Sequence, residues 1–453
     1  MREILREFQS HCTLSDITAG RVRTSRVPRT SVGGHEVKLK SCCRVIGVGA
    51  ALSLVLTSCA DGDDRGGQSS GGSSSGDIVF GQLIGVTGDY APFTPPAISA
   101  AKIAVDEIND AGGVMDRKVV LVTEDNRSTV DGAVAGFSKL TTVDKAMVMG
   151  SLESDGQVAL FDQIQQRQLP NICSSCGTTF LDDRGGKFSF RVTASDSDAG
   201  IIVAQVARDA GVKKLAMIVQ NTEGASGPAE VATEAFEKAG GTVNSVTIEP
   251  GASSYNSEVA KALESQPDAL YLAAGVEAGI PILREINRRG YDIPIYVSPD
   301  LITDEVAALP NAEQLTAALT AFDVDSPAYK SYAERFRAAT GGDPEPGMYD
   351  ANNYDQYVLF ALAMEAAQST NGADVAARIV DVASAPGKKV YSFAEGKEAL
   401  ANGEDIDFDG ASSTLDMNEF GNLESPILAV LKVKDGVWTP GEQVEVDPAL
   451  RPE

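Results

Sequence analysis

The sequence predicts an α/β fold in which parallel sheets are covered by helices on both faces. Short apolar strands alternate with amphipathic helical runs through most of the chain, and strand–helix units repeated at this spacing are typical of parallel sheets. Near Phe190–Thr193 the chain leaves one such sheet, and Asp196–Asp198 is placed to cap the first helix of a second. The length of 453 residues, 43% of them hydrophobic, is enough for two or three domains.

The first 58 residues have the composition of an export signal. A basic segment, Lys38–Arg44, precedes an apolar stretch, Val45–Leu56, which ends shortly before Cys59. The ending Leu56-Thr57-Ser58-Cys59 resembles a bacterial lipoprotein signal, and this resemblance implies cleavage before Cys59 and lipidation of that cysteine. We therefore expect an extracytoplasmic protein anchored to the cell membrane by lipidated Cys59. The alternative is an uncleaved N-terminal anchor.

Two further features concern this N-terminal region. Residues 1–36 are long for the charged part of a signal, which indicates that translation starts near Val37. Residues 59–76 are rich in Gly, Ser and Asp and lack apolar periodicity, so we expect a flexible tether there.

The charge and the residue types of the exported chain exclude several function classes. Removal of residues 1–58 leaves 29 basic and 60 acidic residues, a net charge of −31, and this balance argues against nucleic-acid binding. Both histidines, His11 and His35, are removed as well. Their loss excludes Ser-His-Asp and Cys-His nucleophile systems and His-ligated zinc. The sequence has neither a phosphate-binding glycine–lysine loop nor a G-x-S-x-G motif, so we expect neither an enzyme nor a bound cofactor.

The folded body begins with a predicted strand at Ile78–Ile84, followed by a loop, Gly85–Phe93, that Gly and Pro interrupt. The helix Ala97–Ala111 has apolar residues at helical spacing and stops at Gly112-Gly113. Further strands are predicted at Val119–Thr123, Ala146–Met149, Leu169–Ile172, Leu215–Val219, Thr242–Ile248, Ala269–Ala273 and Pro294–Val297.

The last part of the chain has a different pattern. The strand Leu315–Phe322 leads back towards the first sheet, and Tyr349–Ala367 is a long, mostly apolar helix. Short antiparallel strands are predicted at Ile406–Phe408, Thr414–Met417 and Ile427–Val433, with turns at Asn402-Gly403 and Asp435-Gly436.

Two polar loops are candidates for a binding site. Ser151–Ser154 follows the strand Ala146–Met149, and Cys173–Thr179 follows the strand Leu169–Ile172. In an open parallel sheet, such loops lie at the carboxyl ends of neighbouring strands, where the amides of the following helix face a bound group. Small hydroxyl side chains beside free amides suit a carboxylate. Taken alone, these residues are better explained as ordinary strand–helix connections with N-caps.

Short motifs occur in a fixed order along residues 77–440. They are Gly81–Gly88, Ala104–Asn109 with Gly112-Gly113, Phe190-Arg191 with Ser195-Asp196, Tyr349-Asp350 with Tyr354-Asp355, and Ile406–Ser412. Their order and spacing resemble the branched-chain amino-acid binding proteins that serve ABC importers. The resemblance implies a type I periplasmic-binding-protein fold, in which two Rossmann-like lobes with parallel sheets are joined by a three-crossover hinge and a ligand lies between them.

The resemblance also implies domain boundaries. The first lobe is expected to contain residues 77–192 and 323–375. The second lobe is expected to contain residues 193–322 and 376–440, and residues 441–453 form a C-terminal tail.

Ligand contacts are implied in both polar loops and in the first loop of the body. Ser154 matches the serine that holds the α-carboxylate of the ligand, and Ser175 and Gly177 match the second carboxylate loop. Gly177 stands where the family has a threonine, so Thr178 is expected to supply that hydroxyl. Phe93 matches an aromatic residue that covers the ligand.

The second lobe is expected to bind the other end of the ligand. Asp300, in Ser298-Pro299-Asp300, matches the acidic residue that pairs with the α-ammonium group. The aromatic residue expected after the strand Leu215–Val219 is missing, and Gly224 stands near its place. The resemblance therefore implies an amino acid or an amino-acid-like ligand and leaves the side chain of that ligand undefined.

Cys173 and Cys176 are the only cysteines after Cys59. An exported protein folds in an oxidising compartment where disulfides persist, so a structural disulfide that stiffens the ligand loop is the first hypothesis. Free thiols are the second. A redox-active dithiol is the third, because it would need a helix N-terminus and a thioredoxin-like context.

The segment Asp405–Asp416 fits the spacing of a calcium-binding loop, except that Asp replaces the final Glu. Ile406 and Phe408 alternate as in a strand, and both belong to the family motif. We therefore favour a strand over a calcium site and expect no bound metal.

These observations predict a lipid-anchored solute-binding protein that delivers an amino-acid-like ligand to an ABC permease and its ATPase. A sensory receptor module of the same fold is the alternative, although the sequence shows no signalling domain. A surface hydrolase that uses carboxylates such as Glu153 and Asp300 is a weaker alternative, because the sequence shows no acid/base pair.

Overall fold

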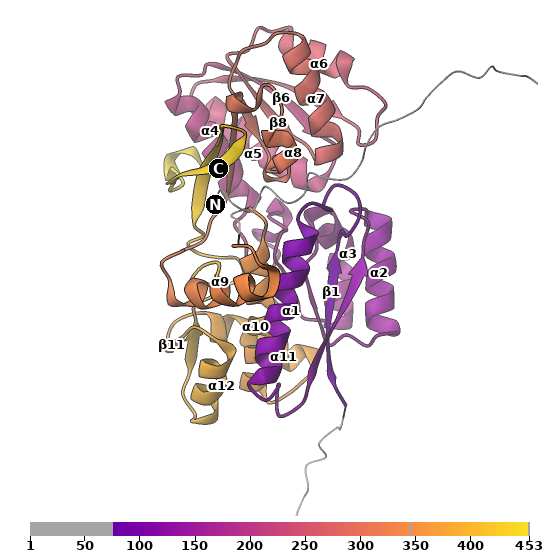
Figure 1. The fold of residues 1–453 in the computed structure, drawn as a ribbon, viewed down its shortest axis with the longest axis vertical. Helices are drawn as coiled ribbons and strands as arrows, with labels where there is room; N and C mark the ends of the chain where they lie inside the picture. The colour runs from indigo at the N-terminus through magenta and orange to yellow at the C-terminus, as the bar shows by residue number, and fades with distance from the viewer. Residues whose placement is uncertain (1–75, 345–346, 452–453) are drawn as a thin grey trace, which may run out of the picture. The chain divides into compact units, whose positions relative to one another are not determined.

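The computed structural model describes residues 76–344 and 347–451, which form two lobes, each built around one large β-sheet (Figure 1). The predicted signal and the predicted lipidation site, Cys59, lie outside the described residues. In the part of the chain that is described, no helix combines the length and the apolar character needed to cross a membrane.

The first lobe contains a five-stranded parallel sheet covered by helices on both faces. Its strands are β1 (Ile78–Ile84), β2 (Val119–Asp125), β3 (Val148–Gly150), β4 (Asn171–Cys173) and β5 (Ser189–Arg191), and its helices are α1 (Thr94–Asp110), α2 (Val130–Thr142), α3 (Ser154–Arg167) and α10 (Asp350–Ala367). The strand order is β2-β1-β3-β4-β5. Because side chains alternate along a strand, Phe80 packs with α1 and α10 on one face, and Leu83 packs with α2 and α3 on the other.

The second lobe contains a seven-stranded sheet with the order β14-β13-β10-β9-β8-β6-β7. Its parallel strands are β6 (Lys214–Gln220), β7 (Thr242–Ile248), β8 (Ala269–Ala273), β9 (Ile295–Val297) and β10 (Leu315–Thr320), and its antiparallel edge is β13 (Leu428–Lys434) with β14 (Val437–Gln443). Helices α4 (Asp196–Asp209) and α5 (Glu223–Lys238) cover one face, and α6 (Asn256–Leu263), α7 (Val276–Arg288) and the short α8 (Asp304–Ala307) cover the other.

The predicted turn at Asp435-Gly436 is confirmed. These two residues connect β13 to β14 with φ angles of 53° and 76°. Two consecutive positive φ angles are the requirement of the two-residue hairpin turn that matches the twist of antiparallel strands.

Three chain segments join the lobes and are hydrogen-bonded to one another. The first follows β5, and its Ala194 amide donates to Thr320 Oγ1 at the start of the second segment (3.3 Å). The Ala321 amide of the second segment donates to the Ile427 carbonyl of the third segment (2.7 Å). The predicted three-crossover hinge is therefore present, with its segments side by side.

The assignment of residues 376–440 to the second lobe was wrong for most of this segment. The elements α11 (Gly372–Ala383), β11 (Lys388–Val390), α12 (Phe393–Ala401) and β12 (Ile406–Phe408) all lie with the first lobe, as does α9 (Pro327–Thr340), which was assigned to that lobe. Ile379, Phe393 and Phe408 are buried in the same core as α1 and α10. Asp355 of α10 fixes the following loop, because its carboxylate accepts hydrogen bonds from the amides of residues 411 and 412. The chain enters the second lobe only near β13.

Two smaller expectations for this region were also wrong. β12 pairs with β11 in parallel rather than antiparallel, and Thr414–Met417 forms no strand, since Met417 makes a single bridge to Leu423. Asn402-Gly403 ends α12 rather than forming a hairpin turn, and the φ angle of 76° at Gly403 is typical of a helix C-terminus.

Candidate functional site

A cavity of about 620 Å³ lies between the two lobes, at the carboxyl ends of both parallel sheets. Loops of the first lobe contribute Tyr90, Ser154 and Ser175, and loops of the second lobe contribute Gly275 and Asp300. This edge is where open α/β sheets bind ligands. The volume is in the range of small-molecule sites, roughly 300–1,000 Å³.

The loop after β3 turns sharply and brings Ser154 to the cavity. Ser151 and Leu152 have φ angles of 63° and 118°, in a region that residues with side chains rarely adopt. Contacts with α10 hold this turn, because the Ser151 amide donates to Gln356 Oε1 (2.8 Å) and the Ser151 hydroxyl donates to Asn353 Oδ1 (2.7 Å). Unfavourable backbone that is held by its surroundings is frequent at ligand sites.

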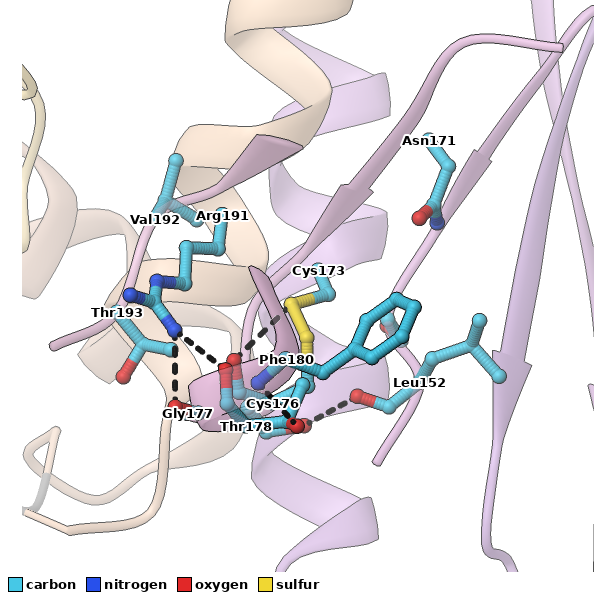
Figure 2. The surroundings of a disulfide bond; sticks show 12 residues. Leu152, Asn171, Cys173, Cys176, Gly177, Thr178, Phe180, Arg191, Val192 and Thr193 are labelled. Carbon is cyan, nitrogen blue, oxygen red and sulfur yellow. Dashed lines mark hydrogen bonds between the residues drawn. A yellow bond between two sulfur atoms is a disulfide. The ribbon is translucent and has the colours of Figure 1, made fainter. Parts of the chain in front are cut away.

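The two polar loops that the sequence singled out are adjacent in the structure. The Ser175 hydroxyl donates a hydrogen bond of 3.1 Å to the Leu152 carbonyl, and Ser154 and Ser175 both line the cavity. A disulfide between Cys173 and Cys176 closes the loop that carries Ser175 (Figure 2). The Ser154 hydroxyl and the first amides of α3 can donate hydrogen bonds to one anionic group, whereas the Ser175 hydroxyl already donates to the Leu152 carbonyl.

Arg191 supports the second of these loops from β5 (Figure 2). Its side chain is buried, with 1% of the residue exposed. The guanidinium donates to the carbonyls of Gly177 (2.8 Å) and Thr178 (3.0 Å) and pairs with Asp182 (2.5 Å). The positive charge of Arg191 is thus bound to the loop and to one carboxylate.

Most of the charged residues that line the cavity are acidic. The carboxylates belong to Asp89, Glu153, Asp155, Asp196, Glu277 and Asp300, and one arginine, Arg127, is also in the lining. Arg127 is exposed to solvent. The lining therefore has a large excess of negative charge.

Asp196 and Asp300 have the most strongly perturbed carboxyl groups of the cavity. Burial, together with the neighbouring charges of Asp89, Asp155 and Glu153, raises the pKa of Asp300 to about 7. Burial likewise raises the pKa of Asp196 to about 8; the charge of Arg191 opposes this shift and that of Asp300 adds to it. Both carboxyls therefore bind protons near neutral pH when nothing else neutralises them.

Two other carboxylates bridge the lobes. Asp155 of α3 accepts a hydrogen bond from the Glu223 amide at the start of α5 (2.9 Å), and Asp89 accepts one from the Glu277 amide at the start of α7 (2.9 Å). Neither α5 nor α7 has a capping side chain of its own. The first lobe therefore supplies the negative groups that the amide ends of these two helices favour.

Two tyrosines form the aromatic part of the lining. Tyr90 and Tyr349 both line the cavity, and their ring centroids are 6.4 Å apart. The Tyr90 hydroxyl is buried and has no hydrogen-bond partner among the described residues. Tyr349 immediately precedes α10 with a φ angle of 53°.

The sequence that forms these two α/β lobes and their polar cavity also matches a known protein family. Residues 77–400 match the family described as Periplasmic binding protein. The chain belongs to the periplasmic binding protein family.

Relatives of this periplasmic binding protein are named as binding proteins. An amino acid binding protein of Pseudomonas aeruginosa is 26% identical over 310 residues, which cover 66% of this chain and 81% of the relative. Leu/Ile/Val-binding protein homolog 1 of Brucella abortus is 22% identical over 312 residues, which cover 68% of this chain and 83% of the relative.

Solved structures of the type I fold are similar to this periplasmic binding protein. A leucine binding protein, LivK, of Thermotoga maritima has a TM-score of 0.70 and 20% identity, covering 82% of this chain and 99% of its own. The substrate binding protein LivJ of Streptococcus pneumoniae, solved with isoleucine, has a TM-score of 0.67 and 20% identity, with the same coverage. A solute binding protein of R. palustris, solved with benzoate, has a TM-score of 0.65 and 18% identity, covering 83% and 99%.

Four of the residues that the sequence nominated lie around the cavity of this binding protein: Ser154, Ser175, Gly177 and Asp300. Gly224 also lines it, and a Cβ atom at this position would lie 3.7 Å from the Cβ atom of Ser154. The missing aromatic residue therefore leaves this part of the cavity open.

The other two nominated residues do not line the cavity. Phe93 is fully buried, and its ring packs behind Tyr90 with centroids 5.1 Å apart, so Tyr90 takes the lining position expected for Phe93. The Thr178 hydroxyl is buried and donates to Glu223 Oε1 (2.7 Å) across the lobes. It is therefore not available to replace the hydroxyl that Gly177 lacks.

Sequence reasoning missed Tyr90, Asp196 and the bridging pair Asp89 and Asp155 as site residues. Asp196 was recognised as the start of a helix, and the direction of its carboxylate depends on Gly177. A Cβ atom at position 177 would lie 2.1 Å from Asp196 Oδ1. The sequence shows glycine at position 177, where the family has threonine. Only the tertiary structure shows that Gly177 and Asp196 lie against each other.

The described residues contain no group of three or more His, Cys, Asp or Glu side chains arranged to hold a metal ion. In the segment considered for calcium, Asp407 and Asp409 both pair with Lys389, at 3.1 Å and 2.7 Å. Residues 406–408 form strand β12.

Proposed function

We propose that this protein is the extracytoplasmic, lipid-anchored solute-binding component of an ABC importer and that it binds an amino acid or a similar small molecule in the cavity between its lobes. The observation that carries this proposal is the pairing of two hydroxyl-rich loops in one lobe with a partly buried carboxyl group, Asp300, in the other.

The first lobe supplies the anion-binding half of the proposed site. Ser154 is the first residue of α3, and its hydroxyl lies beside helix amides that have no partner within the helix. Ser175 lies beside it in the disulfide-closed loop, and its hydroxyl would have to turn from the Leu152 carbonyl to donate to the ligand. A helix N-terminus with a free hydroxyl binds a carboxylate through neutral donors, and the helix dipole adds to the attraction.

The second lobe supplies the cation-binding half. Asp300 lies in a one-turn 3₁₀ helix after β9, and no described residue donates a hydrogen bond to its carboxylate. A buried carboxyl group without a donor favours an ammonium group as its partner. An α-amino acid presents both groups, as does the isoleucine with which LivJ was solved.

Binding across the two lobes connects the ligand to transport. A ligand held by both lobes stabilises the closed arrangement more than the open one, and the difference in affinity between these arrangements determines how far it shifts the equilibrium. The permease and its ATPase are the proposed partners that recognise the closed form. The proposed lipid anchor at Cys59 would keep the protein near them at the membrane.

A ligand screen tests the proposal. Thermal shift measurements with amino acids, amides, urea, short-chain acids and benzoate should give a stabilising ligand among the amino acids, and calorimetry should then give one site per chain. Stabilisation by acids or urea alone, with no response to any amino acid, would contradict the amino-acid assignment.

A further inference from the structure

The acidic residues of the cavity differ in how they are neutralised. Asp89 and Asp155 accept hydrogen bonds from helix amides of the opposite lobe. Glu153 accepts a hydrogen bond from the Gly85 amide at 2.8 Å, and Glu277 is exposed to solvent. These four carboxylates are therefore satisfied by the protein or by water.

Asp196 and Asp300 are not satisfied in this way. No described residue donates a hydrogen bond to either carboxylate, and the Oδ2 atom of Asp196 is buried without a partner. Arg191 is a cation whose charge acts on Asp196, but its guanidinium forms its ion pair with Asp182. Two partly buried acidic groups thus remain in the cavity without a partner of opposite charge.

The residues around this pair also suit a cation. Tyr90, Tyr349, Asp196 and Asp300 all line the cavity, and the charge of Asp300 acts on both tyrosines. Tyr90 is buried, and its hydroxyl lacks a hydrogen-bond partner among the described residues, although Ser175 lies near it. Aromatic faces attract cations, and the free hydroxyl can accept a hydrogen bond from one.

Because Gly177 has no side chain, the Asp196 carboxylate has room beside it at the cavity. Asp196 Oδ1 would be 2.1 Å from a Cβ atom at position 177, so no other residue fits there without displacing this carboxylate. The Asp196 amide also donates to the Gly177 carbonyl at 2.7 Å. A carboxyl group therefore stands where a hydroxyl was expected from the sequence.

We propose that the ligand is a basic amino acid, whose α-ammonium group binds Asp300 and whose side-chain ammonium or guanidinium group binds Asp196. This inference rests on the proposed function and narrows its ligand class. One charge of the ligand neutralises each unpaired carboxylate, and the α-carboxylate remains for Ser154 and the first amides of α3.

Because burial raises the pKa values of Asp196 and Asp300, ligand binding should be coupled to the release of protons. In the empty cavity both carboxyls hold protons near neutral pH, because burial raises each pKa. A cationic ligand favours the ionised forms, so its binding releases protons and strengthens as the pH rises from about 6 to 9. The charges of three groups act on Asp196, namely Arg191, Asp182 and Glu223. Three other charges act on Asp300, those of Asp89, Asp155 and Glu153.

The test compares charged amino acids with neutral ones of matched shape. The exported full-length protein, solubilised in detergent, is titrated calorimetrically with L-arginine and L-citrulline and with L-lysine and L-norleucine. We expect at least one cationic member to bind tenfold or more tightly than its neutral counterpart and to release protons into the buffer. Asp196→Asn should reduce this ratio to within about twofold of one without weakening the neutral ligand.

A control variant and two contrary outcomes complete the design. Asp162→Asn removes an exposed carboxylate of α3 outside the cavity lining and should leave the ratio unchanged. Equal or tighter binding of the neutral amino acids, or an undiminished ratio in Asp196→Asn of unchanged melting temperature, would overturn this inference and leave the proposed function standing. Failure of every amino acid to bind would overturn both.

Discussion

The carboxylate of Asp155 in the first lobe caps the start of α5 in the second lobe, where it accepts a hydrogen bond of 2.9 Å from the Glu223 amide. Asp89 makes the equivalent contact with the start of α7. Both contacts are made between protein groups of opposite lobes, so the protein itself contributes to the stability of the arrangement in which the lobes touch. The ligand and the carboxylates of Asp89 and Asp155 together determine the fraction of molecules in which the lobes touch.

Loss of the Asp155 contact should open the empty protein. Asp155→Ala removes a helix cap worth about 1 kcal/mol, which corresponds to a roughly fivefold change in the ratio of closed to open forms. Small-angle X-ray scattering should give a larger radius of gyration for ligand-free Asp155→Ala than for the wild type, while saturating ligand restores the compact form. Asp162→Ala, on the exposed side of the same helix, is the control, and an equal expansion in both variants would argue against the bridging role.

Ser154→Ala should weaken ligand binding without destabilising the empty protein. The hydroxyl is expected to donate to the charged carboxylate of the ligand, and such hydrogen bonds contribute about 1.5–3 kcal/mol, or roughly ten- to a hundredfold in affinity. Asp300→Asn should have an effect of similar size on a zwitterionic ligand and a much smaller effect on a simple carboxylate. Calorimetry with both ligand types checks this, and Ser138→Ala, an exposed position on α2, serves as control. Unchanged affinity in both site variants would mean that the ligand binds elsewhere.

The stability of the empty protein should fall as the pH rises above 6. In the folded protein the pKa values of Asp196 and Asp300 are raised to about 8 and about 7, whereas an unfolded Asp has a pKa of about 3.9. The native state therefore binds more protons than the unfolded state between these values, and stability is lost as the pH increases through that window. Calorimetric melting at pH 6 and pH 8.5 should show a smaller decrease for the Asp196→Asn/Asp300→Asn variant than for the wild type. A decrease of the same size in both would show that other groups cause it.

Cys173 and Cys176 should be linked in the exported protein. Peptide mass spectrometry without reductant should find the two cysteines in one bridged peptide, and the finding of two alkylatable thiols would contradict the bridge. The Cys173→Ser/Cys176→Ser variant should lose about 2 kcal/mol of unfolding free energy, the amount that closure of so short a loop is expected to contribute. Its ligand affinity should fall as well, because Ser175 lies inside the closed loop.

Cys59 should determine membrane attachment. Cys59→Ala should either release the protein from the membrane fraction or block removal of residues 1–58, since lipidation and cleavage depend on this residue in lipoprotein signals. Fractionation followed by intact-mass measurement distinguishes these results. Recovery of wild-type protein that still carries residues 1–58 would contradict the predicted signal.

The sequence was sufficient for the strands and insufficient for the partners of the last segments. β7 and β8 were predicted with the observed bounds. β8 is an apolar run that forms a fully buried strand, and β7 is rich in the β-branched residues Val, Thr and Ile that strands favour. The position of α11, α12 and β12 depends on which core receives Phe393 and Phe408, and local periodicity does not specify that choice. Asp355, more than fifty residues away, decides it through its hydrogen bonds to the loop after β12.

The site residues were predictable where they depend on the position of a strand end, and they were not predictable where they depend on tertiary contacts. Ser154, Ser175 and Asp300 follow strand ends, where the parallel fold itself places ligand contacts. The contribution of Asp196 could not be predicted, because it requires the close approach of its carboxylate to Gly177. The roles of Asp89 and Asp155 required the two lobes to be placed together, since each caps a helix of the other lobe.

The hydrogen bonds among the three connecting segments limit how the lobes can move. Ala194 is bonded to Thr320, and Ala321 is bonded to Ile427, so a twist of one lobe about the length of these segments would shear the bonds between them. A bend common to all three segments keeps those bonds intact. These bonds therefore favour bending over twisting, and under the proposed function a permease that touches both lobes would distinguish a loaded protein from an empty one by the bend angle.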